Sequence, residues 1–388
     1  MPSPPALPLL SPGTAPGPVP GPLPVAPPGC GTRTVAWRCA QHRADTLEDH
    51  LERLGDWQLD YQQLGRGHFH GRLTELRVPG LQVFAEHTSH ALRQRGLLGA
   101  DSLGLALLPR AATAAPASLS QNGCPVRADE LLAVHDGEVD LRTPDDCLLL
   151  GVVAETAALD QHLARHGLDR QDLPALRPGT VAPVSVPPAT REHLQRVLWQ
   201  ALTGLQPMAD ADADAETAPG PVGAPQAEAV FDALCDALLG LSVPQELPRG
   251  RARQDLVDRA TACMLAQMHE DQGPQLGAIA ARLGASPRTL AYAFDQVLGL
   301  SPMQYLRRLR LNLARRALVR RRADESIYDI ATRHGFWHFG RFSGDYRRQF
   351  GQSPSQTPQR DARAAPLRAA SSPARRPSTS AGAPAAPA

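Results

Sequence analysis

The sequence predicts an α+β protein with a β-rich N-terminal region and an all-α C-terminal module. Three observations lead to this prediction. Short apolar runs bounded by Gly and Pro fill the first part of the chain, as in β proteins. From Arg251 onward the apolar residues recur every three or four positions, as in amphipathic helices. The helical part also contains an internal repeat.

Charge is distributed unevenly along the 388 residues. The totals of 40 basic and 39 acidic residues exclude a uniformly basic coat protein and an acidic disordered chain, and every basic residue is arginine. Residues 1–250 hold 18 arginines and 29 acidic residues, whereas residues 251–360 hold 18 arginines and 9 acidic residues. This asymmetry predicts that the C-terminal third meets a polyanion while the rest has another role.

Cysteine usage and hydropathy indicate the compartment. The six cysteines form no Cys-x-x-Cys pair, so we expect reduced thiols and no zinc knuckle. No stretch approaches the roughly 18 apolar residues of a membrane-spanning helix, and the N-terminus lacks the charged segment of a secretory signal. We therefore expect a soluble, cytoplasmic protein without a membrane partner.

Both ends of the chain are predicted to be disordered. Proline fixes φ and lacks a backbone donor, and the arm 1–32 is rich in it, so the arm builds neither helix nor sheet. The tail 361–388, rich in Ala, Pro, Ser and Arg, is interpreted in the same way.

Residues 33–185 are predicted to form a β-rich domain with the shape of a sandwich or barrel, because turn formers separate apolar runs of strand length. These runs are Trp57–Leu64, Gly71–Val78, Leu81–Ala85, Leu103–Leu108, Glu130–Val134, Val139–Leu141 and Cys147–Ala154.

Residues 186–250 are predicted to be a helical connector. Its helices are Pro188–Thr203 and Ala227–Leu241, and an acidic linker rich in Ala and Pro, Asp210–Pro225, separates them. Two roles remain open for this helix pair. It either packs against a second copy to form a homodimer or covers an open face of its own sheet.

The repeat lies in the predicted domain 251–360. Ile279-Ala280-x-Arg282-x-Gly284 recurs 51 residues later at 330–335, and Gly299-x-Ser301-Pro302 recurs 52 residues later at 351–354. One residue has therefore been inserted in the turn after Gly335. So many matches in the same order, including two Ser-Pro pairs, are improbable by chance.

Each repeat predicts a helix, a tight turn and a second helix. Gly284 and Gly335 supply the positive φ that the turn requires. In the first repeat Ser286 is a helix N-cap with Pro287 at the first helical position, and in the second Ser326 begins a capping box. Two helix-turn-helix units are therefore predicted.

A long helix from Met303 to about Arg320, capped by Ser301-Pro302, connects the two units. Its 18 residues span about 27 Å at 1.5 Å per residue. With the width of the flanking helices, this is comparable with the ~34 Å of one DNA turn, so two reading helices would enter successive major grooves. We expect its arginines, Arg315 among them, to lie outside the helical core.

Residues 251–360 resemble the AraC/XylS family of bacterial transcription regulators. The resemblance rests on Ile279-Ala280, Ser286-Pro287-x-Thr289-Leu290, Phe294, Gly299-Leu300-Ser301-Pro302, Tyr305-Leu306-Arg307, Ile330-Ala331, Gly335-Phe336, Phe342, Tyr346-Arg347, Phe350-Gly351 and Ser353-Pro354. It implies a seven-helix module in which the second helix of each unit reads promoter DNA. It also implies a jelly-roll or cupin-like sensor domain with a small-molecule effector, and activation through contact with RNA polymerase.

The resemblance also implies which residues contact DNA. Base-reading positions carried over by alignment are Arg288, Thr289, Ala291, Tyr292, His338, Gly340, Arg341, Ser343 and Gly344. Arg288 and Arg341 are expected to bond guanine, because a guanidinium fork pairs with its O6 and N7 atoms. Arginines expected at phosphates are Arg307, Arg308, Arg347 and Arg348.

Three features depart from the family pattern or stand beside it. Gly340 and Gly344 replace polar side chains, so the second unit is expected to read few bases beyond Arg341. Ser355-Gln356-Thr357 replaces the usual Tyr-Arg ending, which leaves the final helix unassigned. The aromatic residues after the second turn, at 336, 337 and 339, are expected to pack in the core or in the turn.

Two motifs suggest metal but are incomplete. His68, His70 and Glu75 match half of a cupin metal motif without its second half, and Asp210–Asp214 lacks the glycine and closing glutamate of a calcium loop. Nucleotide-binding, serine-hydrolase and zinc-protease motifs do not occur. We expect no metal, no cofactor and no catalytic residue. The alternatives are an N-terminal interaction or dimerisation platform without ligand, and a metal-dependent cupin-type enzyme.

Overall fold

The computed structural model describes residues 38–54, 57–99, 101–109, 119–169, 179–203, 223–242, 247–268, 274–322 and 324–360. The predicted N-terminal arm 1–32, the tail 361–388 and most of the acidic linker lie outside these residues. Within the described part of the chain, no helix is long and apolar enough to cross a membrane.

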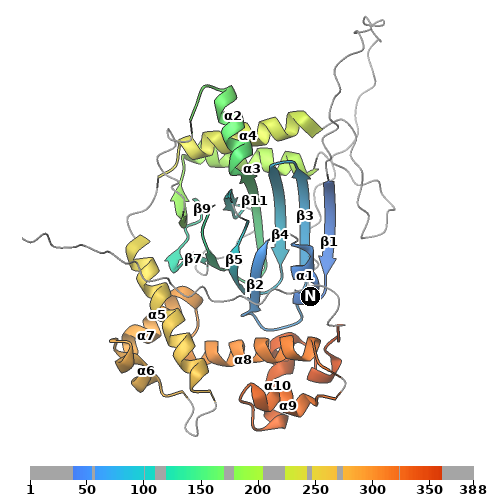
Figure 1. The fold of residues 1–388 in the computed structure, drawn as a ribbon, viewed down its shortest axis with the longest axis vertical. Coiled ribbons are helices and arrows are strands. Elements are labelled where there is room, and N and C mark those ends of the chain that lie inside the picture. Colours follow the sequence, from blue (N-terminus) through green and yellow to red (C-terminus); the bar gives the residue numbers. More distant parts are fainter. Residues whose placement is uncertain are drawn as a thin grey trace, which may run out of the picture. The chain divides into compact units, whose positions relative to one another are not determined.

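Two antiparallel sheets form the N-terminal region (Figure 1). The first has the strand order β1-β3-β4-β11-β6-β9-β12, and the second has the order β2-β5-β10-β7-β8. Their bounds are β1 Arg38–Ala44, β2 Gln58–Gln63, β3 Gly71–Val78, β4 Leu81–Thr88, β5 Leu92–Leu97, β6 Ser102–Leu107, β7 Ser120–Gln121, β8 Cys124–Pro125, β9 Glu130–His135, β10 Val139–Arg142, β11 Cys147–Glu155 and β12 Thr180–Ser185. Every strand run predicted from the sequence coincides with one of these strands.

Alternation of side chains gives the larger sheet two buried faces. In the centre of the sheet Val152 lies opposite Val83 on one side and Leu105 on the other, and all three are buried. One face packs against the smaller sheet through a cluster that includes Trp57, Phe84 and Leu149. A strand buried on both sides reads as an almost continuous apolar run, which explains why Cys147–Ala154 was recognisable in the sequence.

The other face of the larger sheet is covered by helices α2 Thr156–Arg165, α3 Pro188–Thr203 and α4 Gly223–Leu239 (Figure 1). Leu194 and Leu198 of α3 and Leu234 of α4 are buried against the sheet and against each other. Of the two roles left open for the connector helices, the structure shows them covering their own sheet.

Several elements were not predicted from the sequence: α1 Leu47–Arg53, α2, and strands β1, β5, β7, β8 and β12. The reason is clearest in β5, whose sequence Leu-Arg-Gln-Arg-Gly-Leu lacks apolar alternation, although Arg93 and Gln94 are buried in it. Their burial depends on polar partners far away in the sequence, which a local pattern does not reveal.

The C-terminal region is helical, with α5 Leu247–Ala266, α6 Leu276–Arg282, α7 Pro287–Leu298, α8 Pro302–Val319, α9 Ile327–Arg333, α10 Phe339–Phe350 and a 3-10 helix Pro354–Gln356. Ser286 caps α7, and Ser301 and Ser326 form capping boxes at α8 and α9, as predicted. The turn glycines Gly284 and Gly335 have φ of 69° and 74°. Among the described residues, the segment after Ser353 is a 3-10 helix and not a final α-helix, so six α-helices stand where the resemblance implied seven.

Helix α8 separates two small apolar cores. Phe294, Leu306 and Tyr305 lie in the core with α5, α6 and α7, while Phe342, Tyr346 and Phe350 lie in the core with α9 and α10. The predicted outward position of Arg315 on this helix was wrong, because Arg315 is buried against the N-terminal region.

Candidate nucleic-acid interface

Helix α7 presents the four residues predicted for the first reading helix on its exposed face. Leu290 and Phe294 anchor the opposite face, with exposed fractions of 1% and 0%. This one-sided burial follows from apolar residues spaced three and four apart. The exposed residues are Arg288, Thr289, Ala291 and Tyr292.

Helix α10 is arranged in the same way. Phe342 and Tyr346 are 0% exposed and fix the helix against α8 and α9. Of the residues predicted to read bases, His338, Gly340, Arg341 and Gly344 are exposed and Ser343 is half-buried. Since Gly340 and Gly344 bring no side chain, Arg341 is the longest polar side chain that this part of α10 offers, as the sequence indicated.

The aromatic residues of the second turn do not all pack inside. Phe336 lies beneath the Arg310 guanidinium, 4.5 Å from ring centroid to Cζ, and its ring is 5.0 Å from that of Phe342. Trp337 and Phe339, in contrast, are 59% and 42% exposed. The predicted packing in the core or the turn was therefore wrong for Trp337, whereas Phe339 keeps ring contacts with Phe342 and Tyr328, at centroid distances of 6.1 and 6.4 Å, while exposing part of its ring.

The arginines predicted at phosphates differ in their partners. The Arg307 Nε donates to the buried Asp345 carboxylate at 2.9 Å, and Arg348 pairs with the same carboxylate. Asp345 thus joins α10 to α8. Arg347 is exposed.

Arg308 faces the N-terminal region. It donates a hydrogen bond to the Leu64 carbonyl oxygen. Burial, with a smaller contribution from Arg66, lowers the pKa of Arg308. In this arrangement the guanidinium has a protein acceptor where the sequence predicted a phosphate.

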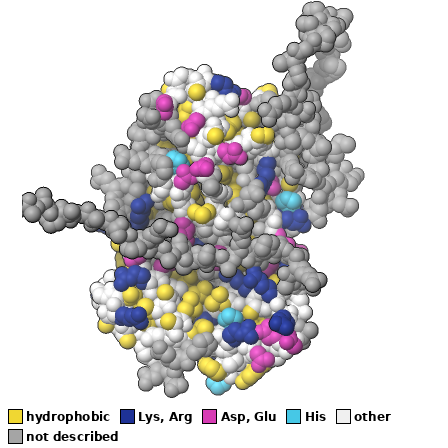
Figure 2. Space-filling view, in the orientation of Figure 1, with side chains coloured by type: hydrophobic (Ala, Val, Ile, Leu, Met, Phe, Trp, Pro, Cys, Tyr) yellow, Lys and Arg dark blue, Asp and Glu magenta, His cyan; other side chains and the backbone are white. Residues whose placement is uncertain are grey.

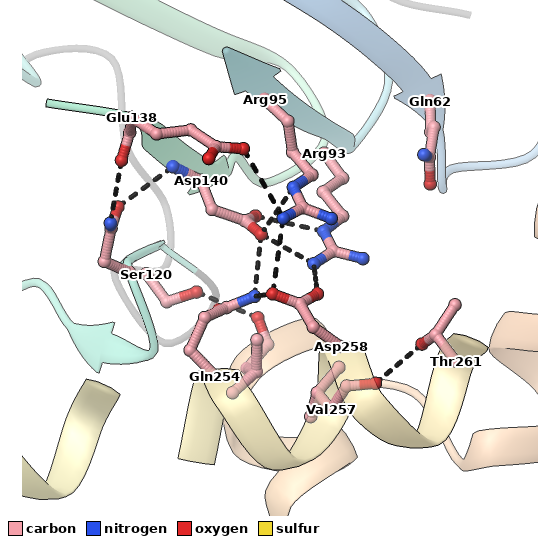
Figure 3. Close-up of polar contacts among 12 residues, drawn as sticks. Gln62, Arg93, Arg95, Ser120, Glu138, Asp140, Gln254, Val257, Asp258 and Thr261 are labelled. Atoms are coloured by element: carbon pink, nitrogen blue, oxygen red, sulfur yellow. Dashed lines mark hydrogen bonds and ion pairs between the residues drawn. The ribbon is translucent and has the colours of Figure 1, made fainter. Parts of the chain in front are cut away.

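A polar network connects the smaller sheet to α5 (Figure 3) and continues to α8. Arg93 on β5, only 1% exposed, donates to Asp140 of β10 at 2.6 Å and to Asp258 of α5 at 2.8 Å. Gln254 of α5 donates to Asp140 at 2.7 Å. The Tyr305 hydroxyl of α8 accepts from Arg93 at 2.5 Å and donates to Gln62 at 3.0 Å. A buried guanidinium is stable here because carboxylates from two elements surround it.

A second set of contacts joins α8 and α10 to β2 and α1. The buried Arg315 guanidinium donates to both oxygens of Glu48, at 2.8 and 2.9 Å. Asn312 exchanges two hydrogen bonds with the Gln63 backbone, at 2.9 and 3.0 Å. Gln349 donates to the carbonyl oxygens of Gln63 and Gly65. Charge-assisted bonds to buried partners of this kind are the strong ones in proteins.

A cavity of about 50 Å³ lies between the two sheets, lined mainly by apolar side chains that include Trp57 and Phe84. Glu86 is a lining residue with an exposed fraction of 2%, and its Oε1 accepts from Tyr61 at 2.9 Å and faces the His50 Nε2 at 2.8 Å. Gln121 also lines the cavity, and its buried Oε1 has no hydrogen-bond partner among the described residues.

The structure does not assemble the incomplete cupin metal motif among the described residues. His70 pairs with Asp45 at 2.9 Å, whereas Glu75 accepts from Arg77 and Gln82 at 2.9 and 2.8 Å. His68 and His70 also lie in a loop before β3, and not on a strand as the motif requires.

Sequence reasoning missed the residues that connect the two regions, such as Arg93, Asp258, Glu48 and Arg315. Arg93 and Asp258 are separated by 165 positions and Glu48 and Arg315 by 267, so no local spacing relates them. The only available signal was weak: two arginines inside a short run between apolar residues at Leu92 and Leu97.

Comparison with known proteins shows what the C-terminal helices are similar to. A family model described as a helix-turn-helix domain matches residues 279–360. Over 103 residues the chain is 39% identical to the probable thc operon regulatory protein of Rhodococcus erythropolis. The matched segment covers 26% of this chain and 30% of that relative. Over 76 residues it is 46% identical to the HTH-type transcriptional activator RhaS of Klebsiella pneumoniae. This matched segment covers 20% of this chain and 27% of RhaS.

A solved structure is similar to about a quarter of the chain. The transcriptional regulator with an AraC-type DNA-binding domain from Chromobacterium violaceum is 33% identical, covers 27% of this chain and 91% of its own, and has a TM-score of 0.25. The chain spans less than a third of the length of each of the two curated relatives. The C-terminal helices of this chain, residues 279–360, are thus similar to the helix-turn-helix domain of AraC/XylS-type transcription regulators.

Proposed function

We propose that the whole chain is a sequence-specific transcription regulator of promoter DNA, with two helix-turn-helix units in residues 251–360. The observation that carries this proposal is the parallel construction of α7 and α10. Each helix follows a glycine turn, buries an apolar stripe and exposes the opposite face at its N-terminal half. This is the form of a recognition helix that enters the major groove. Figure 2 shows arginine side chains on one face of this helical region.

The exposed side chains divide into two roles. Base reading is assigned to the polar and small residues at the start of the two helices, with Arg288 and Arg341 as guanine-binding forks. Phosphate binding is assigned to Arg347 and, through their exposed edges, to Arg307 and Arg348. Arg308 joins them only in an arrangement that releases the Leu64 carbonyl.

The test is binding of the full-length chain to fragments of its source genome, with selection of bound sites and measurement across salt concentrations. The proposal expects a shared sequence element and an affinity that falls steeply with salt, because arginines displace counterions from phosphates. Equal affinity for selected and random duplexes at every salt concentration would contradict it.

For the N-terminal region we propose a sensor domain, residues 33–185, of jelly-roll or cupin type that binds a small-molecule effector. The apolar cavity with Glu86 and the unpartnered Gln121 carbonyl favours this over a ligand-free platform, since both offer acceptors to a ligand that donates hydrogen bonds. A cavity of about 50 Å³ holds one or two waters, so the effector is either a few atoms in size or separates the sheets.

Thermal unfolding of the chain with a panel of small amines, alcohols and aromatic compounds distinguishes the sensor from the platform. A ligand that binds only the folded state raises the melting temperature. The matched control is Gln121→Leu, which removes the unpartnered acceptor. A panel without any shift in the unaltered chain favours the dimerisation or interaction platform.

Activation through RNA polymerase, and a homodimer, complete the proposed function. Support for activation comes from the relatives, one of which is named an activator. Transcription from a selected site with purified polymerase, with and without the chain, measures the sign of regulation. Light scattering measures the number of copies per particle.

A further inference from the structure

Helices α2 and α4 bring two histidines and two carboxylates together on the outer side of the larger sheet. His162 lies on α2, and His166 is the residue that ends it. Glu228 and Asp232 are four residues apart on α4. Residues four apart on a helix share a face, so each helix directs its pair toward the other.

We propose that His162, His166 and Asp232 bind one divalent transition-metal ion, with zinc as the ion that this donor set favours. This departs from the expectation of no metal drawn from the sequence, and it is independent of the DNA-binding function. Within the described residues, these three side chains are the group whose ligand atoms all lie within 4.8 Å of one another.

The distances suit a metal ion shared between the helices. Asp232 Oδ1 lies 2.9 Å from the His162 Nε2 and 3.7 Å from the His166 Nε2. Zinc bonds of about 2.0–2.1 Å in tetrahedral geometry place ligand atoms about 3.3 Å apart. Small side-chain adjustments therefore convert the observed cluster into a coordination shell.

Glu228 orients the buried histidine from its other side. His162 is 1% exposed, and its Nδ1 lies 3.0 Å from the Glu228 Oε2. The second Glu228 oxygen accepts from Arg165 at 2.5 Å, and this hydrogen bond lowers the pKa of Glu228. At 3.0 Å from Glu228 the Nδ1 forms no well-aligned hydrogen bond, so a small rotation must bring Glu228 into line before it accepts the Nδ1 proton. The Nε2 lone pair then faces a metal, which is the usual outer-shell arrangement of a metal-binding histidine.

The His162 ring is fixed by stacking as well. Phe231 lies parallel to it, with ring centroids 5.1 Å apart and an interplanar angle of 19°. The stacked ring holds the His162 Nε2 beside the Asp232 carboxylate, and His166 brings a second imidazole to the same carboxylate.

His166 and Asp232 are each 56% exposed, which gives an ion a path from solvent. Three protein ligands leave the fourth position to a water molecule. Two imidazoles and one carboxylate suit zinc better than magnesium or calcium, which prefer oxygen ligands only. The bound ion would join α2 to α4, and so fix the helical layer that covers the sheet.

The test uses untagged full-length protein, stripped of metal and titrated with cobalt and with zinc alone. The proposal expects one cobalt per chain, with visible absorption of nitrogen and oxygen coordination and without the near-ultraviolet thiolate band that cysteine ligation would produce. Zinc should displace the cobalt and raise the melting temperature, and the rise should grow with the logarithm of the free zinc concentration once that concentration exceeds the dissociation constant.

Variants locate the site. His166→Gln and Asp232→Asn, both at exposed positions, should weaken cobalt binding by about tenfold or more, and Glu228→Gln by about 10- to 100-fold. His87→Gln is the matched control, since His87 forms an exposed pair with Asp146 at 2.7 Å without a second histidine, and it should leave binding unchanged.

Three results would overturn the proposal. The first is uptake of less than one cobalt per chain at micromolar protein, and the second is a thiolate band. The third is an unchanged cobalt affinity in His166→Gln or Asp232→Asn, provided that cooperative unfolding shows the variant to be folded. Because these measurements involve no DNA, their outcome is independent of the proposed regulator function.

Discussion

The same residue type has different roles in this chain according to its surroundings. All basic side chains are arginine, yet Arg93 is 1% exposed among carboxylates, Arg308 donates to a backbone carbonyl and Arg341 lies on the surface of α10. Arginine abundance alone therefore says little, and the partner of each guanidinium determines which arginines are available to DNA.

Arg341 and Arg347 separate base reading from phosphate binding on one helix. Arg341→Ala should cost about 1–3 kcal/mol at one base pair and relax preference there. Arg347→Ala should weaken specific and random DNA alike and reduce the salt slope by about 1. Competition binding with single-base variants of a selected site, at several salt concentrations, measures both effects. Identical behaviour of the two variants would refute the assignment of these roles.

Cysteine reactivity follows burial in the same way. Desolvation, with nearby Asp232 and Asp236, raises the pKa of Cys235 to about 11, and desolvation beside Glu86 raises the pKa of Cys147 further. Only the thiolate is nucleophilic, so both should resist iodoacetamide at pH 8 in the folded chain, whereas half-buried Cys263 reacts. Mass spectrometry of the alkylated peptides measures this. Equal labelling of Cys147 and Cys263 would show that the core around Cys147 opens readily.

At the scale of elements, local chemistry made most of the helical region predictable. Ser-Pro caps, glycine turns and apolar stripes act within a few residues, so the start of α7 and the approximate extent of α8 followed from the sequence. Strand β5 and the burial of Arg315 did not, because their partners lie in other elements. The prediction of the base-reading residues depended on the resemblance to a family, and the structure adds that most of these residues are exposed.

The capping box at Ser301 fixes where α8 begins. Ser301 accepts from the Gln304 backbone at 3.4 Å, and Gln304 accepts from the Ser301 backbone at 3.1 Å. Ser301→Ala should lower the free energy of unfolding by about 1 kcal/mol, whereas the control Ser301→Gly should cost only a few tenths of a kcal/mol. Urea unfolding followed by circular dichroism measures both. A larger loss for glycine than for alanine would mean that the cap does not hold this helix end.

At the scale of the whole molecule, the sheets and the helices are joined by polar contacts that continue to the cavity. Glu86 lines the cavity and accepts from Tyr61, whose backbone carbonyl accepts from Arg316 of α8 at 2.9 Å. A second contact to the same helix is the one between Glu48 of α1 and Arg315 of α8. A ligand that moved Glu86 would therefore act on the helix that connects α7 and α10.

The Glu48–Arg315 pair tests how firmly the helices are held. Both residues are buried, so removing one partner leaves an uncompensated charge: Glu48→Leu or Arg315→Met alone should each cost about 3–5 kcal/mol. The double variant removes both charges and should recover most of that loss. The surface pair Arg322–Asp324, 82% and 74% exposed, is the control, and its disruption should cost at most about 1 kcal/mol.

Calorimetry of the same variants asks whether the two regions unfold together. If this contact couples them, each single variant should split one thermal transition into two, because the helical region loses its attachment to α1 while its own cores around Phe294 and Phe342 remain. DNA affinity of the single variants gives the functional consequence. A single transition together with an unchanged free energy of unfolding would show that the Glu48–Arg315 contact does not attach the helical region to the sheets. The proposed coupling between the cavity at Glu86 and α8 would then be contradicted.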